Sequence, residues 1–108
     1  MNKTFWKEAT YEGSGRHELR LDDMGDDMVL LSVSDVSIAY SYAYRKPDCK
    51  YELNFCNFGY SKHLKMRAET LEEAKAEAVI WIRNEIQGLI NSYRNRVIDL
   101  ESLFKKIK

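Results

Sequence analysis

A long run of helical periodicity over residues 70–107 constrains this fold more than any other stretch. Its apolar side chains recur about every 3.6 residues, which is the period of an α-helix. At its start, Thr70 and Glu73 form a capping box that can satisfy free backbone N–H groups of the first turn. The sequence therefore predicts a helix with these apolar positions: Leu71, Ala74, Ala78, Ile82, Ile86, Leu89, Tyr93, Val97, Leu100, Phe104 and Ile107.

Such a helix is longer than the sheet that the rest of the chain can build. It would span roughly 57 Å, whereas a sheet of about five or six short strands is about 20–28 Å across. Either the helix breaks and folds back, or its last part packs on a second copy of the chain. We expect a homodimer through the apolar side chains of this last part, which are Tyr93, Val97, Leu100, Phe104 and Ile107.

The same helix has one weak place, near residues 92–96. Asn91, Ser92 and Asn95 are mediocre helix formers, so we expect a kink or a split there. A strict repeat of 3.5 residues would indicate a left-handed coiled coil, and an average of about 3.6 does not.

Length and composition indicate one domain with a real core. The chain has 108 residues, of which 44% are hydrophobic, and a net charge of zero, unlike a dedicated DNA-binding domain. We see no signal peptide, and the longest uncharged stretch is far shorter than the ~20 residues that span a bilayer. We expect a cytoplasmic protein without a membrane partner, forming one domain over 1–108 with its sheet in 1–69 and its helix in 70–107.

The part of the chain before the helix alternates in the manner of strands and is punctuated by turns. Strands first and a helix last, with short connections, predict an α+β fold. The expected architecture is an antiparallel β-meander of five to six strands followed by a long C-terminal helix packed on one face. The expected strands are Thr4–Glu12, Arg16–Leu21, Met28–Ser34, Val36–Tyr44, Lys50–Phe58 and His63–Ala68.

The expected strand Val36–Tyr44 would carry tyrosines on one face and small residues on the other, and either face could pack on the helix. An aromatic sheet face beside basic residues is typical of single-stranded nucleic-acid binding, whereas tyrosine stripes also serve as core or protein interface. Tyr40, Tyr42 and Tyr44 are therefore candidate partner-binding residues. The alternative nucleic-acid site comprises Tyr42, Tyr44, Arg45, Lys46, Lys50, Lys65 and Arg67.

A cluster of four carboxylates occupies one expected turn. Its spacing is not that of a calcium-binding loop, which needs acids at its first, third and fifth positions. We interpret it as a solvated hairpin turn that could contact a basic partner surface, and we expect no metal site. The cluster consists of Asp22, Asp23, Asp26 and Asp27.

The sequence carries no catalytic signature. His17 and His63 have no metal-ligand or nucleophile partners at a recognisable spacing. Cys49 and Cys56 would lie about 23 Å apart on one extended strand, too far for a disulfide, so we expect two reduced thiols with Cys56 packed. We therefore expect no enzyme and no cofactor.

The function expected from these features is that of a non-enzymatic interaction module that binds and regulates or inhibits another macromolecule. Small size and missing chemistry fit a phage or mobile-element inhibitor of a host defence nuclease, of the anti-CRISPR kind. The alternative is a single-stranded nucleic-acid-binding protein that uses the aromatic and basic sheet face.

Overall fold

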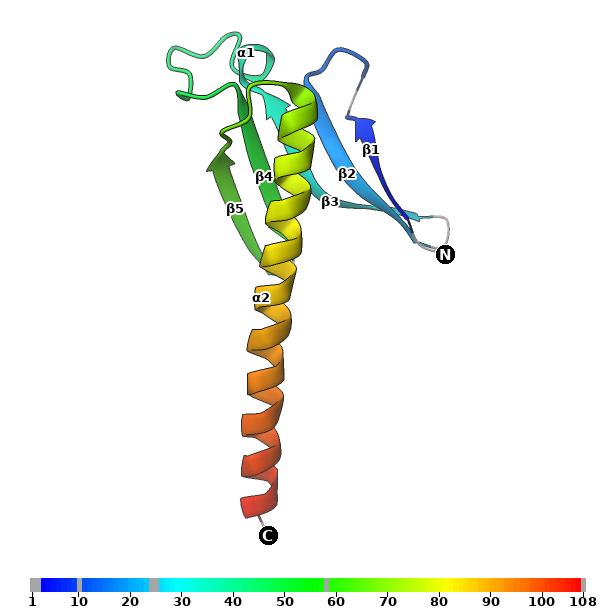
Figure 1. Cartoon of the computed structure of the whole chain (residues 1–108), viewed down its shortest axis with the longest axis vertical. Coiled ribbons are helices and arrows are strands. Elements are labelled where there is room, and N and C mark those ends of the chain that lie inside the picture. Colours follow the sequence, from blue (N-terminus) through cyan, green and yellow to red (C-terminus); the bar gives the residue numbers. More distant parts are fainter. Residues whose placement is uncertain (1–2, 10, 24–25, 58, 108) are drawn as a thin grey trace. The chain divides into compact units, whose positions relative to one another are not determined.

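The protein has an α+β fold, with a five-stranded antiparallel sheet followed by a long C-terminal helix (Figure 1). It divides into two units, residues 1–78 and residues 79–108. The single domain over 1–108 stays a prediction. The computed structural model describes residues 3–9, 11–23, 26–57 and 59–107, and for Asp23, Asp26 and Asp27 it describes the backbone alone.

Each strand pairs with the next one along the chain, always antiparallel, which confirms the predicted meander. The elements are β1 (Thr4–Glu8), β2 (Arg16–Asp23), β3 (Asp26–Asp35), α1 (Val36–Ala39), β4 (Tyr51–Asn57), β5 (Tyr60–Lys65) and α2 (Leu71–Lys106).

One face of the sheet is apolar and forms the core of the first unit. The register pairs Leu19 with Leu31 and Val33 with Leu53, so these side chains share that face. All four are almost completely buried, as is Phe55 two residues further along β4. The first turns of α2 belong to this unit and add two buried alanines, Ala74 and Ala78, while the Lys75 ammonium lies 5.7 Å from the Trp6 ring centroid.

The predicted strand Val36–Tyr44 is wrong, because the chain forms the short helix α1 there and then a loop over residues 40–50. The Asp35 carboxylate accepts hydrogen bonds from the Ser37 backbone N–H at 2.9 Å and the Ser37 hydroxyl at 2.6 Å. This N-cap starts a helical turn where the alternation predicted extended chain. No sheet face made of tyrosines or of small residues forms from this segment.

The other strand boundaries move by a few residues. β1 ends at Glu8, and the last strand is Tyr60–Lys65 because Asn57 pairs with Tyr60 across a tight turn. The acidic stretch is less of a loop than predicted. Asp22 pairs with Asp27 and Asp23 with Asp26, so β2 and β3 continue through it to a two-residue connection.

Helix α2 runs without interruption from Leu71 to Lys106, so the predicted kink or split at 92–96 is wrong. The low helix propensity of asparagine and serine amounts to only about 0.7 kcal/mol per residue, and the segment holds no proline to remove a backbone donor. The Gln87 side-chain amide also donates to the Asn91 side-chain oxygen at 3.1 Å, one turn further along.

The predicted cap of this helix is confirmed in outline. The Glu73 backbone N–H donates to the Thr70 hydroxyl oxygen at 3.2 Å. The Glu73 carboxylate reaches back to the backbone N–H of Glu69 at 3.0 Å, one residue earlier than a capping box requires.

The Glu8 carboxylate fastens the connection between β1 and β2. It accepts hydrogen bonds from the backbone N–H groups of Gly13 at 2.9 Å and Gly15 at 3.2 Å. Both hydrogen bonds favour the charged form and lower the pKa of Glu8 below its usual value. The connection needs glycine at both places, since Gly13 and Gly15 have φ of +91° and +75°.

We expect Glu8→Gln to reduce the pH dependence of stability. Because the pKa of Glu8 is lowered on folding, its contribution is present above the unfolded-state carboxyl pKa of about 4.3 and disappears as pH falls through the folded pKa. Urea denaturation should therefore show wild type more stable than the variant at pH 7, with the difference shrinking towards pH 3. The exposed Glu12→Gln is the control, and a Glu8→Gln deficit that ignores pH would contradict this account.

Candidate functional site

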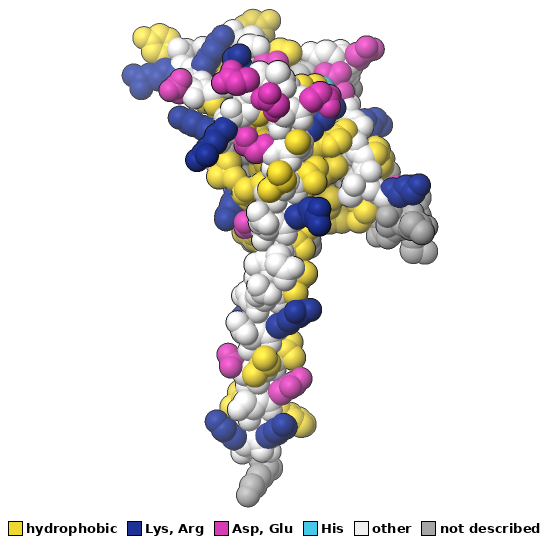
Figure 2. Space-filling view, viewed as in Figure 1, with side chains coloured by type: hydrophobic (Ala, Val, Ile, Leu, Met, Phe, Trp, Pro, Cys, Tyr) yellow, Lys and Arg dark blue, Asp and Glu magenta, His cyan; other side chains and the backbone are white. Residues whose placement is uncertain are grey.

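The most exposed apolar surface of the second unit is a row of side chains on α2 and at Ile107 directly after it, called the α2 stripe below. Their exposed fractions range from 38% to 78%. The space-filling view shows hydrophobic side chains along this part of the helix, interspersed with charged ones (Figure 2). The stripe consists of Ile90, Tyr93, Val97, Leu100, Phe104 and Ile107.

The spacing within the α2 stripe differs from that of the whole helix. Its members are separated alternately by three and four residues, which is the heptad spacing of a coiled-coil seam. The four-residue steps from Ala74 through Ile86 raise the average over the helix to about 3.6 and conceal this local repeat. The period of the helix as a whole therefore disfavours a coiled coil, whereas the spacing in its last part is compatible with one.

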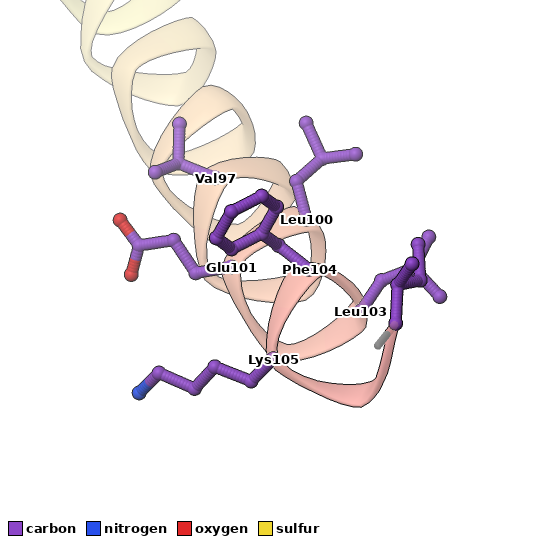
Figure 3. Close-up of a pocket in the computed structure, with 7 residues that line it drawn as sticks. Val97, Leu100, Glu101, Leu103, Phe104 and Lys105 are labelled. Carbon is purple, nitrogen blue, oxygen red and sulfur yellow. The ribbon is translucent and has the colours of Figure 1, made fainter.

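Charged side chains border the α2 stripe on both sides. In the close-up, Glu101 and Lys105 project to one side of Phe104, and Leu103 projects to the other (Figure 3). Arg94 is exposed about two turns before Glu101, and Arg96 is exposed about two turns before Leu103. The stripe thus has the layout of an interface, with an apolar centre and a charged edge.

The sequence identified five of the six stripe residues, because a helical period alone places them on one face. The predicted set left out Ile90, because the four-residue steps of the average repeat pass over it. It also left out Leu103, which lies next to the stripe. Ile98 is as exposed as they are but lies outside the heptad positions.

The tyrosines predicted to line a sheet face lie instead at or after the end of α1. Tyr42 and Tyr44 are fully exposed in the 40–50 loop, and Arg45 and Lys46 follow them, also exposed. The predicted nucleic-acid site is therefore only partly assembled, with these four residues in a single loop.

The other basic residues of that predicted site lie on different elements. The Lys50 ammonium pairs with the Glu69 carboxylate at 2.8 Å, and this hydrogen bond raises the pKa of Lys50. Lys65 ends β5, and Arg67 follows it with its backbone N–H bonded to the Glu77 carboxylate at 3.1 Å.

Tyr40 joins a polar cluster that the sequence did not reveal. Its hydroxyl donates to the carboxylate of Glu52, which is only 3% exposed, and this hydrogen bond raises the pKa of Tyr40. The same carboxylate contacts His63 Nε2 on the neighbouring strand β5. Because Asn54 is the residue directly paired with His63, Glu52 and His63 meet diagonally across the ladder.

A second buried carboxylate, Glu18, lies on the same polar face of the sheet. Arg20 donates to it through Nε at 3.0 Å and through Nη2, and Arg16 Nη2 lies 3.6 Å from its other oxygen. The register places Glu18 beside Ser32, and Ser34 beside Glu52. Among the described residues, every buried side-chain nitrogen or oxygen has a hydrogen-bond partner, so this face is held together by its own contacts.

A small cavity of about 90 Å³ opens on this polar face, with Arg16, Ser32, Asn54 and Cys56 in its lining. It is large enough for a few waters and far below the ~300 Å³ at which ligand pockets begin. Within the described part of the chain, no group of histidine, cysteine or acidic residues is placed to hold a metal ion.

The predicted acidic contact site is described only in part. Asp22 is exposed at the end of β2, directly across the ladder from Asp27. The side chains of Asp23, Asp26 and Asp27 lie outside the described residues. The backbone register still brings acidic residues of β2 and β3 opposite one another at the end of this hairpin.

Both cysteines are free thiols, and the prediction that Cys56 is packed is wrong. Leu53 and Phe55 of β4 point into the apolar core, so the next residue, Cys56, projects from the opposite face and is exposed. Cys49 is half-buried in the 40–50 loop. Burial, and then the negative charge of Glu52, raise the pKa of the Cys49 thiol.

We expect iodoacetamide to alkylate Cys56 at least about tenfold faster than Cys49 at pH 7.5, because the thiolate is the reactive form and a raised pKa makes it scarcer at Cys49. Mass spectrometry of the digested protein measures both rates. Cys56→Ser should leave only the slow reaction, and equal rates at the two cysteines would contradict the expectation.

By its fold, the chain is an α+β protein built of an antiparallel meander and a long C-terminal helix. It matches no protein family model, no curated protein and no solved structure. Among the described residues, no α-helix combines the length and hydropathy that crossing a bilayer requires.

Proposed function

We propose that this chain is a non-enzymatic cytoplasmic interaction protein that regulates or inhibits another macromolecule by binding it, and that it acts as a homodimer through the α2 stripe. The α2 stripe is the observation that supports the proposal. Contiguous exposed apolar side chains usually mark a surface that another molecule covers. A phage-type inhibitor of a host defence nuclease is one protein of this kind.

The free energy available from covering the α2 stripe is large. Burying a side chain the size of leucine or phenylalanine is worth about 1.5–3 kcal/mol. An isolated helix of about 12–15 residues is marginal in water, so the last part of α2 gains from packing against something. A second copy of the chain would present the same apolar row, which has the same length.

The polar residues support binding rather than catalysis. The raised pKa of the Cys49 thiol keeps it protonated at neutral pH, which is unfavourable for a nucleophile. The carboxylates of Glu18 and Glu52 are engaged with arginine, histidine and tyrosine side chains of the same sheet face and its adjoining loop.

The 40–50 loop is the surface we propose for the regulated protein partner. Tyr42 and Tyr44 present complete rings to solvent, and tyrosine is enriched at protein interfaces because its ring is apolar and its hydroxyl can hydrogen-bond. A dimer would display this loop twice, which raises the apparent affinity for a partner with two binding places.

Light scattering during size-exclusion chromatography tests the proposed assembly. A dimer has a mass of about 25 kDa, twice the 12.7 kDa of one chain. A constant 12.7 kDa across a hundredfold dilution series from millimolar protein would refute the homodimer. Pull-down with the dimer, compared with a Tyr42→Ala, Tyr44→Ala double variant, then tests the loop as the partner surface.

A second candidate function is single-stranded nucleic-acid binding by the same loop. The observation that favours it is the adjacency of two exposed rings and two exposed cations, Arg45 and Lys46. Stacked bases would contribute about 1–3 kcal/mol each, and phosphate contacts would make binding fall steeply with salt. Co-migration with a labelled random oligonucleotide, lost at high salt and in Tyr42→Ala, would move this function ahead.

A further inference from the structure

The spacing of the α2 stripe reads the same in both directions. From Ile90 forward its members are separated by three, four, three, four and three residues, and from Ile107 backward the steps are identical. A copy of the helix laid down in reverse therefore matches the row residue for residue. Such an arrangement pairs Ile90 with the partner's Ile107, Tyr93 with the partner's Phe104, and Val97 with the partner's Leu100.

We infer that two copies of the chain associate as an antiparallel two-stranded coiled coil over residues 90–107. This inference rests on the proposed dimer and adds the direction and register of its helices. In the resulting two-fold symmetric interface, every contact occurs twice.

The charges that border the stripe fit this direction. Arg94 and Glu101 each follow a stripe residue, Tyr93 and Leu100, so they lie on the same edge of the helix. In an antiparallel pair that edge meets the same edge of the partner, which brings Arg94 to the partner's Glu101 and Glu101 to the partner's Arg94. Opposite charges therefore meet twice.

The other edge is also compatible. Arg96 and Leu103 each precede a stripe residue and would meet the partner's Leu103 and Arg96. The aliphatic stem of arginine can cover a leucine while its guanidinium stays in water. Within residues 90–107, neither edge brings like charges together.

A parallel pair would also join opposite charges, Arg96 with the partner's Glu101, but it has two disadvantages. It brings both copies of the basic C-terminal turn, with Lys105 and Lys106, to one end, where like charges repel. It also brings both first units, residues 1–78 of each copy, to the other end. The antiparallel pair places the two C-terminal turns at opposite ends, and it does the same with the two first units.

The apolar surface is large enough for a stable pair. Stripe residues together with Leu103 offer on the order of 100 Å² each, so pairing would remove at most about 700 Å² per copy from water. A standard specific interface buries about 800 Å² per partner.

Charge reversal at Glu101 tests the direction of the helices. Glu101→Arg alone would oppose two arginine pairs, and we expect it to raise the dimer Kd about tenfold at low salt. Adding Arg94→Glu restores opposite charges in the antiparallel pair, whereas adding Arg96→Glu restores them only in a parallel pair. Sedimentation equilibrium gives each Kd, and circular dichroism confirms equal helix content.

Recovery of the wild-type Kd by Arg94→Glu and not by Arg96→Glu is the expected result. Any other pattern, obtained while wild type remains a dimer, would overturn the antiparallel arrangement and leave the dimer standing. A wild-type chain that is monomeric at every concentration would instead remove the proposed dimer itself.

Discussion

Leu100→Asp is expected to convert the protein into a monomer of 12.7 kDa while the sheet stays folded. Leu100 lies near the middle of the α2 stripe and is 63% exposed in the single chain, so the substitution costs the monomer little. In a dimer it removes two buried leucines and buries two carboxylates. We expect the dimer Kd to rise at least about 100-fold, measured by light scattering over a dilution series.

The chain offers a closely matched control. Ile98 is 61% exposed on the same turn of helix but lies outside the stripe positions, so Ile98→Asp should remain a dimer. Phe104→Asp should behave like Leu100→Asp. If Leu100→Asp and Ile98→Asp weakened association equally, the α2 stripe would not be the interface.

Phe55→Ala is expected to lower the free energy of unfolding by about 3–5 kcal/mol, the usual cost of removing a buried phenylalanine ring. Phe55 is 1% exposed, and its ring centroid lies 5.4 Å from that of Tyr60. Because small domains are stable by only about 5–15 kcal/mol, this loss is a large fraction of the stability of the sheet. Urea denaturation followed by fluorescence measures the change.

Tyr42→Ala is the matched aromatic control for Phe55→Ala. Its ring is fully exposed in the 40–50 loop, so the change in unfolding free energy should stay within about 0.5 kcal/mol. A large destabilisation by Tyr42→Ala would mean that the loop packs its tyrosines. A small effect of Phe55→Ala would mean that the apolar sheet face is not the core.

The β-meander was predictable because its strands are short, alternating and separated by turns. Residues 36–44 were wrongly predicted to form a strand, because an alternating sequence pattern does not show whether the side chains are buried. Only Val36 of that segment is buried, and Asp35, the last residue of β3, caps the helical turn that follows. A local hydrogen bond thus prevailed over a period-two pattern whose outward-facing side chains had nothing to pack against.

The helix shows the opposite error. Three mediocre helix formers within residues 91–95 predicted a break, yet α2 continues through them. Propensity differences of tenths of a kcal/mol do not interrupt a helix that lacks proline and is capped at Thr70. The helical period placed most of the α2 stripe on one face of the helix. This required only that the segment form a single helix.

The polar cluster of Tyr40, Glu52 and His63 could not be found in the same way. Glu52 and His63 come from different strands, and the register that makes them neighbours depends on where the β4–β5 turn falls. A shift of one residue would send one of the two to the opposite face. Tyr40 reaches them only because the predicted strand is a helical turn and a loop.

If α2 pairs as proposed, its unbroken course would link the lifetime of this protein to its abundance. In a single chain the last part of α2 is exposed to solvent, and an exposed helix end opens more easily than a packed one. A frayed segment fits the extended cleft of a protease, whereas a paired one does not. Copies that have found no partner would therefore be trimmed first, so that cellular turnover favours the assembled form.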